Sequence, residues 1–316
     1  MNLSEIAKKL KNEKSVALIC HVRPDGDTIG SALALKLALD EIGVTAQVAC
    51  ADPVPERFFF LDQAKLIKSS LDGEFSAIIA IDCADITRLG DFAFDFDKHK
   101  NTYSIDHHVS NNNYAKFNYM FDRASNAENV LELIELLGAT LTKEIANLLA
   151  MGMVTDTGNF RHKNVTEQTL ITAGKLVKNG ADLNNIYYHT FTKKSAQKAK
   201  LFGLTMQRIR YFLDGKFAVA TVRLDDFEKS GAKQDETEGF IDFVMGIEGV
   251  MVGACVMETA VNKFKISFRS KGADVSAVAG TFGGGGHILA SGCQIQGEYE
   301  EVIDKITFAV SRYIPE

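Results

Sequence analysis

The stretch that decides the fold is His21-Val-Arg-Pro-Asp-Gly-Asp-Thr-Ile-Gly-Ser31, which stands between two apolar runs. The run before it, residues 16–20, is short and continuous and predicts a buried strand. The Ala/Leu run after it, residues 32–39, predicts a helix. The motif therefore lies on a strand-to-helix loop at the carboxyl edge of a sheet, where open α/β sheets keep their active sites.

The side chains of this loop suit a hard metal ion. His21, Asp25 and Asp27 place an imidazole and two carboxylates within a short segment, and Gly26 and Gly30 let the backbone turn tightly. Such an oxygen-rich cluster favours Mn²⁺ or Mg²⁺. The alternative interpretation is a polar turn in which one carboxylate caps the following helix.

A second acid follows another predicted strand. Asp82 comes directly after the apolar run 75–81, and burying its carboxylate without a cation or hydrogen-bond donors nearby would be costly. We therefore predict that Asp82 is a metal ligand. The alternative is a helix N-cap, a role that Asp85 or Thr87 could fill equally well.

Two later segments extend this series. A strand predicted over 101–105 runs into Asp106-His107-His108, where one histidine can bind a metal while its neighbour faces substrate or hydrogen-bonds a ligand. A helix predicted over 142–150 leads into a Gly-flanked turn that holds Asp156. Because chance gives no reason for acids and imidazoles to collect at successive strand ends, these segments point to one site.

Composition restricts the class of protein. The chain has 316 residues, 46% of them hydrophobic and 24% charged, which is enough for two domains with real cores. Its formal net charge of −6 argues against a non-specific nucleic-acid coat but permits a locally basic pocket. No apolar stretch is long enough for a membrane span, and the scattered cysteines suit buried thiols in a reducing cytoplasm: Cys20, Cys50, Cys83, Cys255 and Cys293.

The second half of the chain changes character. Residues 184–210 are mostly helical in pattern and predict a connector, whose lysines are typical of a solvated face. Beyond it we expect a smaller, separate α/β domain. Its predicted strands are 216–223, 250–257 and 264–269, and its predicted helices are 238–245, 274–279 and 299–313.

A run of four glycines in Phe282-Gly-Gly-Gly-Gly-His287 is the main candidate for substrate binding in this half. Packing does not explain four successive glycines, because they fill no space, whereas they let backbone N–H groups approach an anion. His287 can add a charge-assisted donor, and Arg269 and Lys271 can add positive charge. A flexible loop is the alternative.

Taken together, these residues form a motif pattern that is typical of a known family. The set His21-x-x-x-Asp25-x-Asp27, Asp82, Asp106-His107-His108, Asp156 and Gly283-Gly-Gly-Gly-His287 resembles the DHH phosphoesterase superfamily with its C-terminal DHHA1 domain, and its length and layout are most similar to the NrnA-type nanoRNase and pAp phosphatase branch. The resemblance implies a larger N-terminal α/β DHH domain with a mainly parallel sheet (1–183), a helical connector (184–212) and a smaller C-terminal α/β DHHA1 domain (213–316). It also implies an active site in the cleft between the two domains.

The resemblance also assigns roles to residues. It implies a first metal held by His21, Asp25, Asp82 and Asp156, and a second held by Asp27, Asp82, His107 and Asp156. It implies that His108 faces the scissile phosphate, as a catalytic residue together with Asp82 and Asp156, and that the substrate is bound by Arg269, Gly285, Gly286 and His287. Segment 122–129 departs from the Ser/Thr-rich pattern of the family, although Ser125, Asn126 and Glu128 keep part of its character.

The implied activity is hydrolysis at phosphorus with two divalent ions, Mn²⁺ first and Mg²⁺ or Co²⁺ as alternatives. We expect a cytoplasmic enzyme that degrades very short single-stranded oligoribonucleotides to 5′-mononucleotides and dephosphorylates pAp, without a membrane partner. A homodimer is an open alternative to a monomer. Two other functions stay open, namely a phosphodiesterase for cyclic or linear dinucleotides such as pApA or pGpG, and a non-catalytic nucleotide-binding regulator. The regulator predicts a missing metal ligand, and none is missing.

Overall fold

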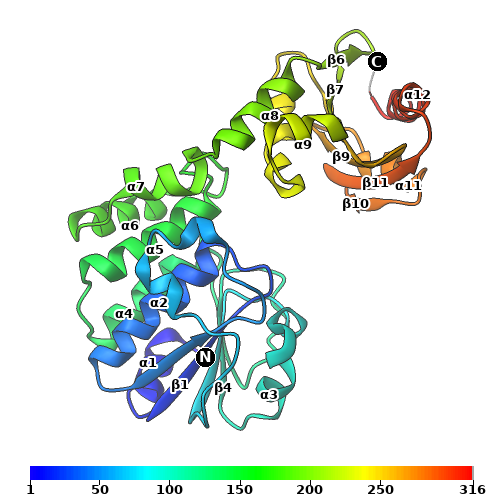
Figure 1. Ribbon diagram of the computed structural model, residues 1–316. Helices are drawn as coiled ribbons and strands as arrows, with labels where there is room; N and C mark the ends of the chain where they lie inside the picture. The colour runs from blue at the N-terminus through cyan, green and yellow to red at the C-terminus, as the bar shows by residue number, and fades with distance from the viewer. Residues whose placement is uncertain (315–316) are drawn as a thin grey trace. The chain divides into compact units, whose positions relative to one another are not determined.

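The chain folds into two compact units. The computed structural model describes residues 1–314, and the chain divides into Met1–Lys193 and Lys194–Glu316 (Figure 1). Both units combine a β-sheet with helices, which confirms the expected two-domain α/β class. None of the described helices is long and apolar enough to cross a membrane. All five cysteines are buried, as expected from their apolar surroundings in the sequence.

The first unit is built on a five-stranded parallel sheet with the strand order β2-β1-β3-β4-β5. Its strands are β1 (Ser15–Cys20), β2 (Thr45–Ala49), β3 (Ala77–Ile81), β4 (Thr102–Asp106) and β5 (Phe117–Met120). Strand β3 is buried along its whole length, because side chains of a parallel sheet are covered on both faces. Parallel pairing brings the carboxyl ends of β1, β3 and β4 to the same edge, which is where the candidate residues follow.

Helices cover both faces of this sheet. In β1, Val16 and Leu18 pack with the helices of one face, whereas Ala17 and Ile19 face the segment around α3. The helices of the unit are α1 (Leu3–Leu10), α2 (Gly26–Glu41), α3 (Ala93–Lys98), α4 (Asn126–Leu137), α5 (Lys143–Asp156), α6 (Glu167–Lys178) and α7 (Leu183–Tyr187). Short 3₁₀ segments lie at Glu56–Phe58, Asp62–Leu66 and Ile86–Phe92, and a π-helical turn lies at Tyr188–Thr192.

Close packing of α2 against α5 positions the motif. A Cβ added to Gly30 of α2 would lie 2.2 Å from the carbonyl oxygen of Leu148 on α5, so only glycine fits at this contact. Helix α5 also corrects one expectation, since it continues to Asp156 instead of ending near residue 150. Gly152 does not break the helix because this part of α5 is buried, and tertiary packing outweighs the low helix propensity of glycine.

The second unit contains a six-stranded mixed sheet with the order β10-β11-β9-β8-β7-β6, in which β7 and β8 are parallel and the other pairs are antiparallel. The strands are β6 (Arg210–Phe212), β7 (Phe217–Val222), β8 (Val252–Ala260), β9 (Lys263–Ser270), β10 (Gly285–His287) and β11 (Ala290–Gln296). The helices are α8 (Ala196–Met206), α9 (Leu224–Ser230), α10 (Phe240–Met245), α11 (Val275–Gly280) and α12 (Tyr299–Ser311), with a 3₁₀ segment at Gln234–Thr237. Helices α11 and α12 pack on one face of the sheet, and α8 and α10 pack on the other.

Candidate active site

The loop between β1 and α2 carries the first residues of the site. Asp25 is the N-cap of α2, and its Oδ1 accepts hydrogen bonds from the backbone N–H groups of Asp27 at 3.0 Å and Thr28 at 3.2 Å. Its other oxygen, Oδ2, lies 3.6 Å from Nε2 of His21. The capping interpretation and the ligand interpretation are therefore compatible, because each uses a different oxygen of the same carboxylate.

Asp82 occupies the centre of the site. It directly follows β3 with a φ of 57°, a left-handed conformation that costs a non-glycine residue energy and is frequent at functional sites. Its Oδ2 lies 3.7 Å from Nε2 of His21 and its Oδ1 lies 3.3 Å from Nε2 of His107. Asp82 does not serve as the N-cap of the following 3₁₀ segment, since Asp85 accepts the N–H of Thr87 there.

His107 has the orientation of a metal ligand. Its Nδ1 lies 2.9 Å from the backbone oxygen of Arg123, so Nδ1–H donates a hydrogen bond to this carbonyl. In this tautomer, Nε2 carries a lone pair. Nε2 lies 3.3 Å from Oδ1 of Asp82 and 3.5 Å from Oδ2 of Asp156. A hydrogen bond of this kind to the distal ring nitrogen fixes both the tautomer and the direction of the ligand.

Asp27 is held by the amino end of helix α4. Its carboxylate is fully buried and accepts the backbone N–H groups of Asn126 at 2.5 Å and Ala127 at 2.9 Å, as well as the hydroxyl of Ser31 at 3.0 Å. A Cβ on Gly152 would lie 2.5 Å from Oδ1 of Asp27, so α5 approaches the carboxylate as closely as a glycine permits. The sequence gives no signal for these anchors, although they lie in segment 122–129, which departs from the family pattern.

His108 lies beside the cluster and is oriented by a buried acid. Its Nδ1 is 2.7 Å from Oδ1 of Asp106, so Asp106 accepts a hydrogen bond from Nδ1–H. The other oxygen of Asp106 accepts a 2.6 Å hydrogen bond from the side-chain amide of Asn111, which is itself buried. This chain of contacts holds the His108 ring in one orientation. Asp106 belongs to the quoted motif, whereas no sequence signal pointed to Asn111.

The combined cluster fits divalent metal ions. Three groups of side chains each offer ligand atoms within 4.8 Å of one another: His21, Asp25 and Asp82; Asp82, His107 and His108; and Asp27, His107 and Asp156. Oδ1 of Asp82 and Nε2 of His107 are buried and have no hydrogen-bond partner within the described residues. Burial without a partner is costly, and a bound cation would remove that cost for both atoms.

The charge balance leads to the same conclusion. Burial, together with the nearby carboxylates of Asp27 and Asp82, raises the pKa of Asp156. Burial and Asp82 likewise raise the pKa of Asp27, although His107 opposes this. The cluster thus holds more carboxylates than its own surroundings neutralise, which favours a cation among them. The donors are oxygen and imidazole nitrogen without thiolate, and this set suits Mn²⁺ and Mg²⁺.

Two substrate-binding candidates of the second unit, Arg269 and His287, share one face of its sheet. His287 on β10 pairs with Ala290 on β11, and Ala290 pairs with Arg269 on β9, so the three lie in one cross-strand row. Paired residues of antiparallel strands point to the same face of the sheet. Gly285, Gly286 and His287 are exposed.

The structure excludes a flexible loop at Gly285–His287. Gly285 and Gly286 belong to strand β10 and pair with β11. Packing does explain two of the glycines, because a Cβ on Gly284 would lie 2.2 Å from the carbonyl oxygen of Gly292, and one on Gly286 would lie 2.6 Å from that of Ala290. The expectation that packing cannot account for the run was therefore wrong for these two positions, since the close approach of β11 requires them to lack side chains.

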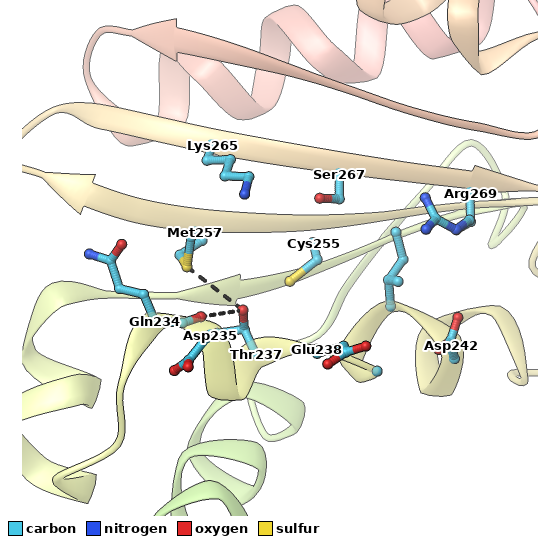
Figure 2. Close-up of a pocket in the computed structure, with 12 residues that line it drawn as sticks. Gln234, Asp235, Thr237, Glu238, Asp242, Cys255, Met257, Lys265, Ser267 and Arg269 are labelled. Atoms are coloured by element: carbon cyan, nitrogen blue, oxygen red, sulfur yellow. Dashed lines mark hydrogen bonds between the residues drawn. The ribbon is translucent and has the colours of Figure 1, made fainter. Parts of the chain in front are cut away.

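Arg269 also lines a pocket of about 380 Å³ that the sequence did not indicate. Figure 2 shows Lys265, Ser267 and Arg269 along β9, with Asp235 and Glu238 on the segment across the pocket. The three β9 residues alternate along the strand and therefore project from the same face. The pocket thus combines basic and acidic side chains next to a predicted substrate residue.

Comparison with protein families identifies both units. The model of the DHH family N-terminal domain matches residues 15–153, and that of the DHHA1 domain matches residues 214–316. The chain belongs to the DHH family. The DHH match covers β1 to β5 and most of α5, so it contains every candidate ligand except Asp156.

Two relatives of this DHH-family chain match almost its whole length. It is 29% identical over 320 residues to the bifunctional oligoribonuclease and PAP phosphatase NrnA of Thermus thermophilus. This match covers 98% of the chain and 94% of the relative. It is 27% identical to the protein of the same name from Bacillus subtilis, over 92% of this chain and 93% of the relative. These comparisons confirm the expected family and, at the level of enzyme class, a DHH-family hydrolase.

Solved structures confirm the fold. An exopolyphosphatase-related protein from Bacteroides fragilis has a TM-score of 0.84 at 24% identity and covers 98% of this chain and 96% of its own. The exonuclease RecJ bound to manganese has a TM-score of 0.56 at 13% identity and covers 99% of this chain and 95% of its own. At these identities, the likeness shows that the DHH and DHHA1 folds are shared.

Proposed function

We propose that this DHH-family protein is a Mn²⁺-dependent phosphoesterase that hydrolyses very short oligoribonucleotides to 5′-mononucleotides and removes the 3′-phosphate of pAp. The observation that carries the proposal is the convergence of acids and imidazoles around Asp82, with two buried ligand atoms that have no partner within the described residues. The names of the relatives supply the substrate class.

In this proposal, His21, Asp25, Asp82 and Asp156 hold the first metal, and Asp27, Asp82, His107 and Asp156 hold the second. Mn²⁺ is the preferred ion, with Mg²⁺ or Co²⁺ as alternatives. When bound, two such ions lower the pKa of a water and stabilise the charge of an in-line displacement at phosphorus. In this proposal, segment 1–183 carries the residues for hydrolysis and segment 213–316 binds the substrate. Segment 184–212 connects these two domains.

The chain's own residues position the reacting groups. The α4 N–H groups and Ser31 keep the Asp27 carboxylate in place, and the carbonyl of Arg123 directs Nε2 of His107. Nδ1 of His108 donates a hydrogen bond to Asp106, and this carboxylate raises the pKa of His108. In the protonated ring, Nε2–H can donate a proton to a phosphate oxygen or to the leaving alkoxide. Fixed donors of this kind need no reorganisation when charge develops.

The second unit supplies the phosphate contacts. Arg269 and His287 lie in one cross-strand row, and the exposed Gly285 and Gly286 have no side chain that would keep an anion away from the backbone. The net charge of −6 makes such local contacts necessary for a polyanionic substrate. A cytoplasmic location accompanies the proposal as a prediction, and a homodimer stays an open alternative to a monomer.

The direct test is hydrolysis of a labelled 5-mer RNA beside pAp, with Mn²⁺, with Mg²⁺ and after chelation. We expect stepwise release of 5′-mononucleotides from the RNA, formation of adenosine monophosphate from pAp, and loss of both activities on chelation. Absence of turnover on both substrates, with Mn²⁺ shown to be bound, would contradict the proposal.

Replacing His287 by alanine separates substrate binding from metal binding. We expect kcat/KM on the 5-mer to fall about 10- to 100-fold, the loss of one charge-assisted hydrogen bond, while the Mn²⁺ content stays that of the parent protein. Steady-state kinetics and elemental analysis measure the two quantities. Lys305→Ala, which removes an exposed charge paired with Glu301 on α12, is the control. Loss of metal in the His287 variant would show that its role has been misassigned.

A further inference from the structure

Arg88 is a cation at the edge of the metal cluster that the predicted mechanism does not use. It lies on the 3₁₀ segment Ile86–Phe92, and its backbone oxygen accepts the N–H of Val22 at 2.7 Å. Gly90 of the same segment has a φ of 60° and packs so closely that an added Cβ would lie 2.8 Å from Cγ1 of Val22. The segment is thereby fixed against the loop that carries His21, and the position of Arg88 is determined by the backbone.

The guanidinium of Arg88 contacts a proposed metal ligand and not an acid. Its Nη2 lies 3.0 Å from Nδ1 of His21. Within the described residues, Arg88 forms no ion pair with a carboxylate, although the carboxylates of Asp25 and Asp82 lie near the other ring nitrogen of His21. Arg88 is only partly exposed, so this cation is partly desolvated without a counter-charge of its own.

The contact with His21 is incompatible with metal binding. Nδ1 of His21 also lies 2.8 Å from the backbone oxygen of Val22. An imidazole nitrogen can donate to that carbonyl or accept from Arg88, but it cannot do both. When Nε2 acts as a metal ligand, Nδ1 carries the proton and donates to Val22. The guanidinium then has no acceptor on His21, and its N–H groups are available for another ligand.

We propose that Arg88 binds a non-bridging oxygen of the phosphate undergoing hydrolysis and is a further catalytic residue. The inference rests on the proposed phosphoesterase function, which brings a phosphate to the same cluster. A guanidinium presents parallel N–H donors that match the geometry of phosphate oxygens, and it keeps its charge throughout the reaction. Charge that develops on the phosphate oxygens is stabilised by a donor held in this position.

The test compares Arg88→Gln, Arg88→Lys and the control Arg312→Gln, which removes a surface arginine that lies over the Phe308 ring. Three quantities are measured in each protein: Mn²⁺ per chain, the Kd of 5′-AMP by calorimetry with Mn²⁺ present, and kcat/KM on the 5-mer RNA. Circular dichroism and thermal melting establish that each variant is folded.

For Arg88→Gln we expect an unchanged Mn²⁺ content, about tenfold weaker binding of 5′-AMP, and a kcat/KM lower by about 100- to 1,000-fold, the range for loss of one transition-state donor. Arg88→Lys should recover part of both losses, because lysine keeps the charge but lacks the paired donors. The control should match the parent protein.

Two outcomes would overturn the inference. Loss of Mn²⁺ in Arg88→Gln would show that Arg88 acts only through His21, and parent-like binding and turnover in that variant would show that it contacts no phosphate. A parent protein that fails to hydrolyse RNA but binds 5′-AMP in an Arg88-dependent manner would contradict the proposed function while supporting the phosphate contact.

Discussion

Replacing Asp82 by alanine should abolish both Mn²⁺ binding and hydrolysis. Its two oxygens face different imidazoles, with Oδ2 at 3.7 Å from His21 and Oδ1 at 3.3 Å from His107, so both proposed metal positions depend on it. We expect turnover of the 5-mer to fall by more than about 1,000-fold, because losing only an outer partner of a metal ligand already costs about 10- to 100-fold. Elemental analysis and steady-state kinetics with Mn²⁺ check this result.

Asp62→Ala is the matched control, since it removes an exposed carboxylate from the same unit. Its Mn²⁺ content and activity should equal those of the parent protein. The Asp82 variant should also fold, because alanine removes a buried carboxylate oxygen that has no hydrogen-bond partner within the described residues. Turnover with Mn²⁺ in a folded Asp82→Ala protein would refute the two-metal assignment.

Gly152→Ala should disturb the site by displacing Asp27, a proposed metal ligand that packs against α5. The new Cβ would lie 2.5 Å from Oδ1 of Asp27 and 3.0 Å from Cβ of Ala127. The Asp27 carboxylate and the amino end of α4 must therefore both move away from α5. We expect the free energy of unfolding to fall by about 1–3 kcal/mol, as for other overpacked cores. Displacement of Asp27 should also lower kcat/KM by about 10- to 100-fold, the effect of disturbing the support of a metal ligand.

Gly174→Ala is the control for this change. Gly174 lies in helix α6, and no atom lies within 4 Å of the position that a Cβ would take. Alanine there should raise the free energy of unfolding by about 0.5–1 kcal/mol, because it restricts the unfolded chain and suits a helix. Urea denaturation measures both variants. Parent-like stability and Mn²⁺ binding in Gly152→Ala would mean that α5 does not press on Asp27.

Local patterns in the sequence were sufficient for the framework of the first unit. The continuous apolar runs of β1 and β3 are the signature of buried parallel strands, and the acids that follow them are costly to bury without a partner. Parallel pairing alone then brings His21, Asp82 and His107 to one edge of the sheet. These inferences need only the periodicity of strands and the energetics of charge, both of which are local properties.

Other features escaped local patterns because their partners are distant in the chain. Strand β5 was not expected, since its residues are partly buried or exposed and show little apolar periodicity. Strand β10 was not expected, since glycine has a low strand propensity, whereas the close approach of β11 requires glycine at 284 and 286. In each case, tertiary packing outweighed the intrinsic preference of the residue.

The sequence by itself determined which chemistry this protein can carry, because the residue types and their order at the strand ends identify a family and a set of candidate metal ligands. Only the tertiary structure decided how those ligands are held. Asp27 is anchored by N–H groups about a hundred residues away, and Arg88 meets His21 through a turn that no periodicity marks. Such contacts depend on the packing of whole elements, and packing is a property of the folded chain.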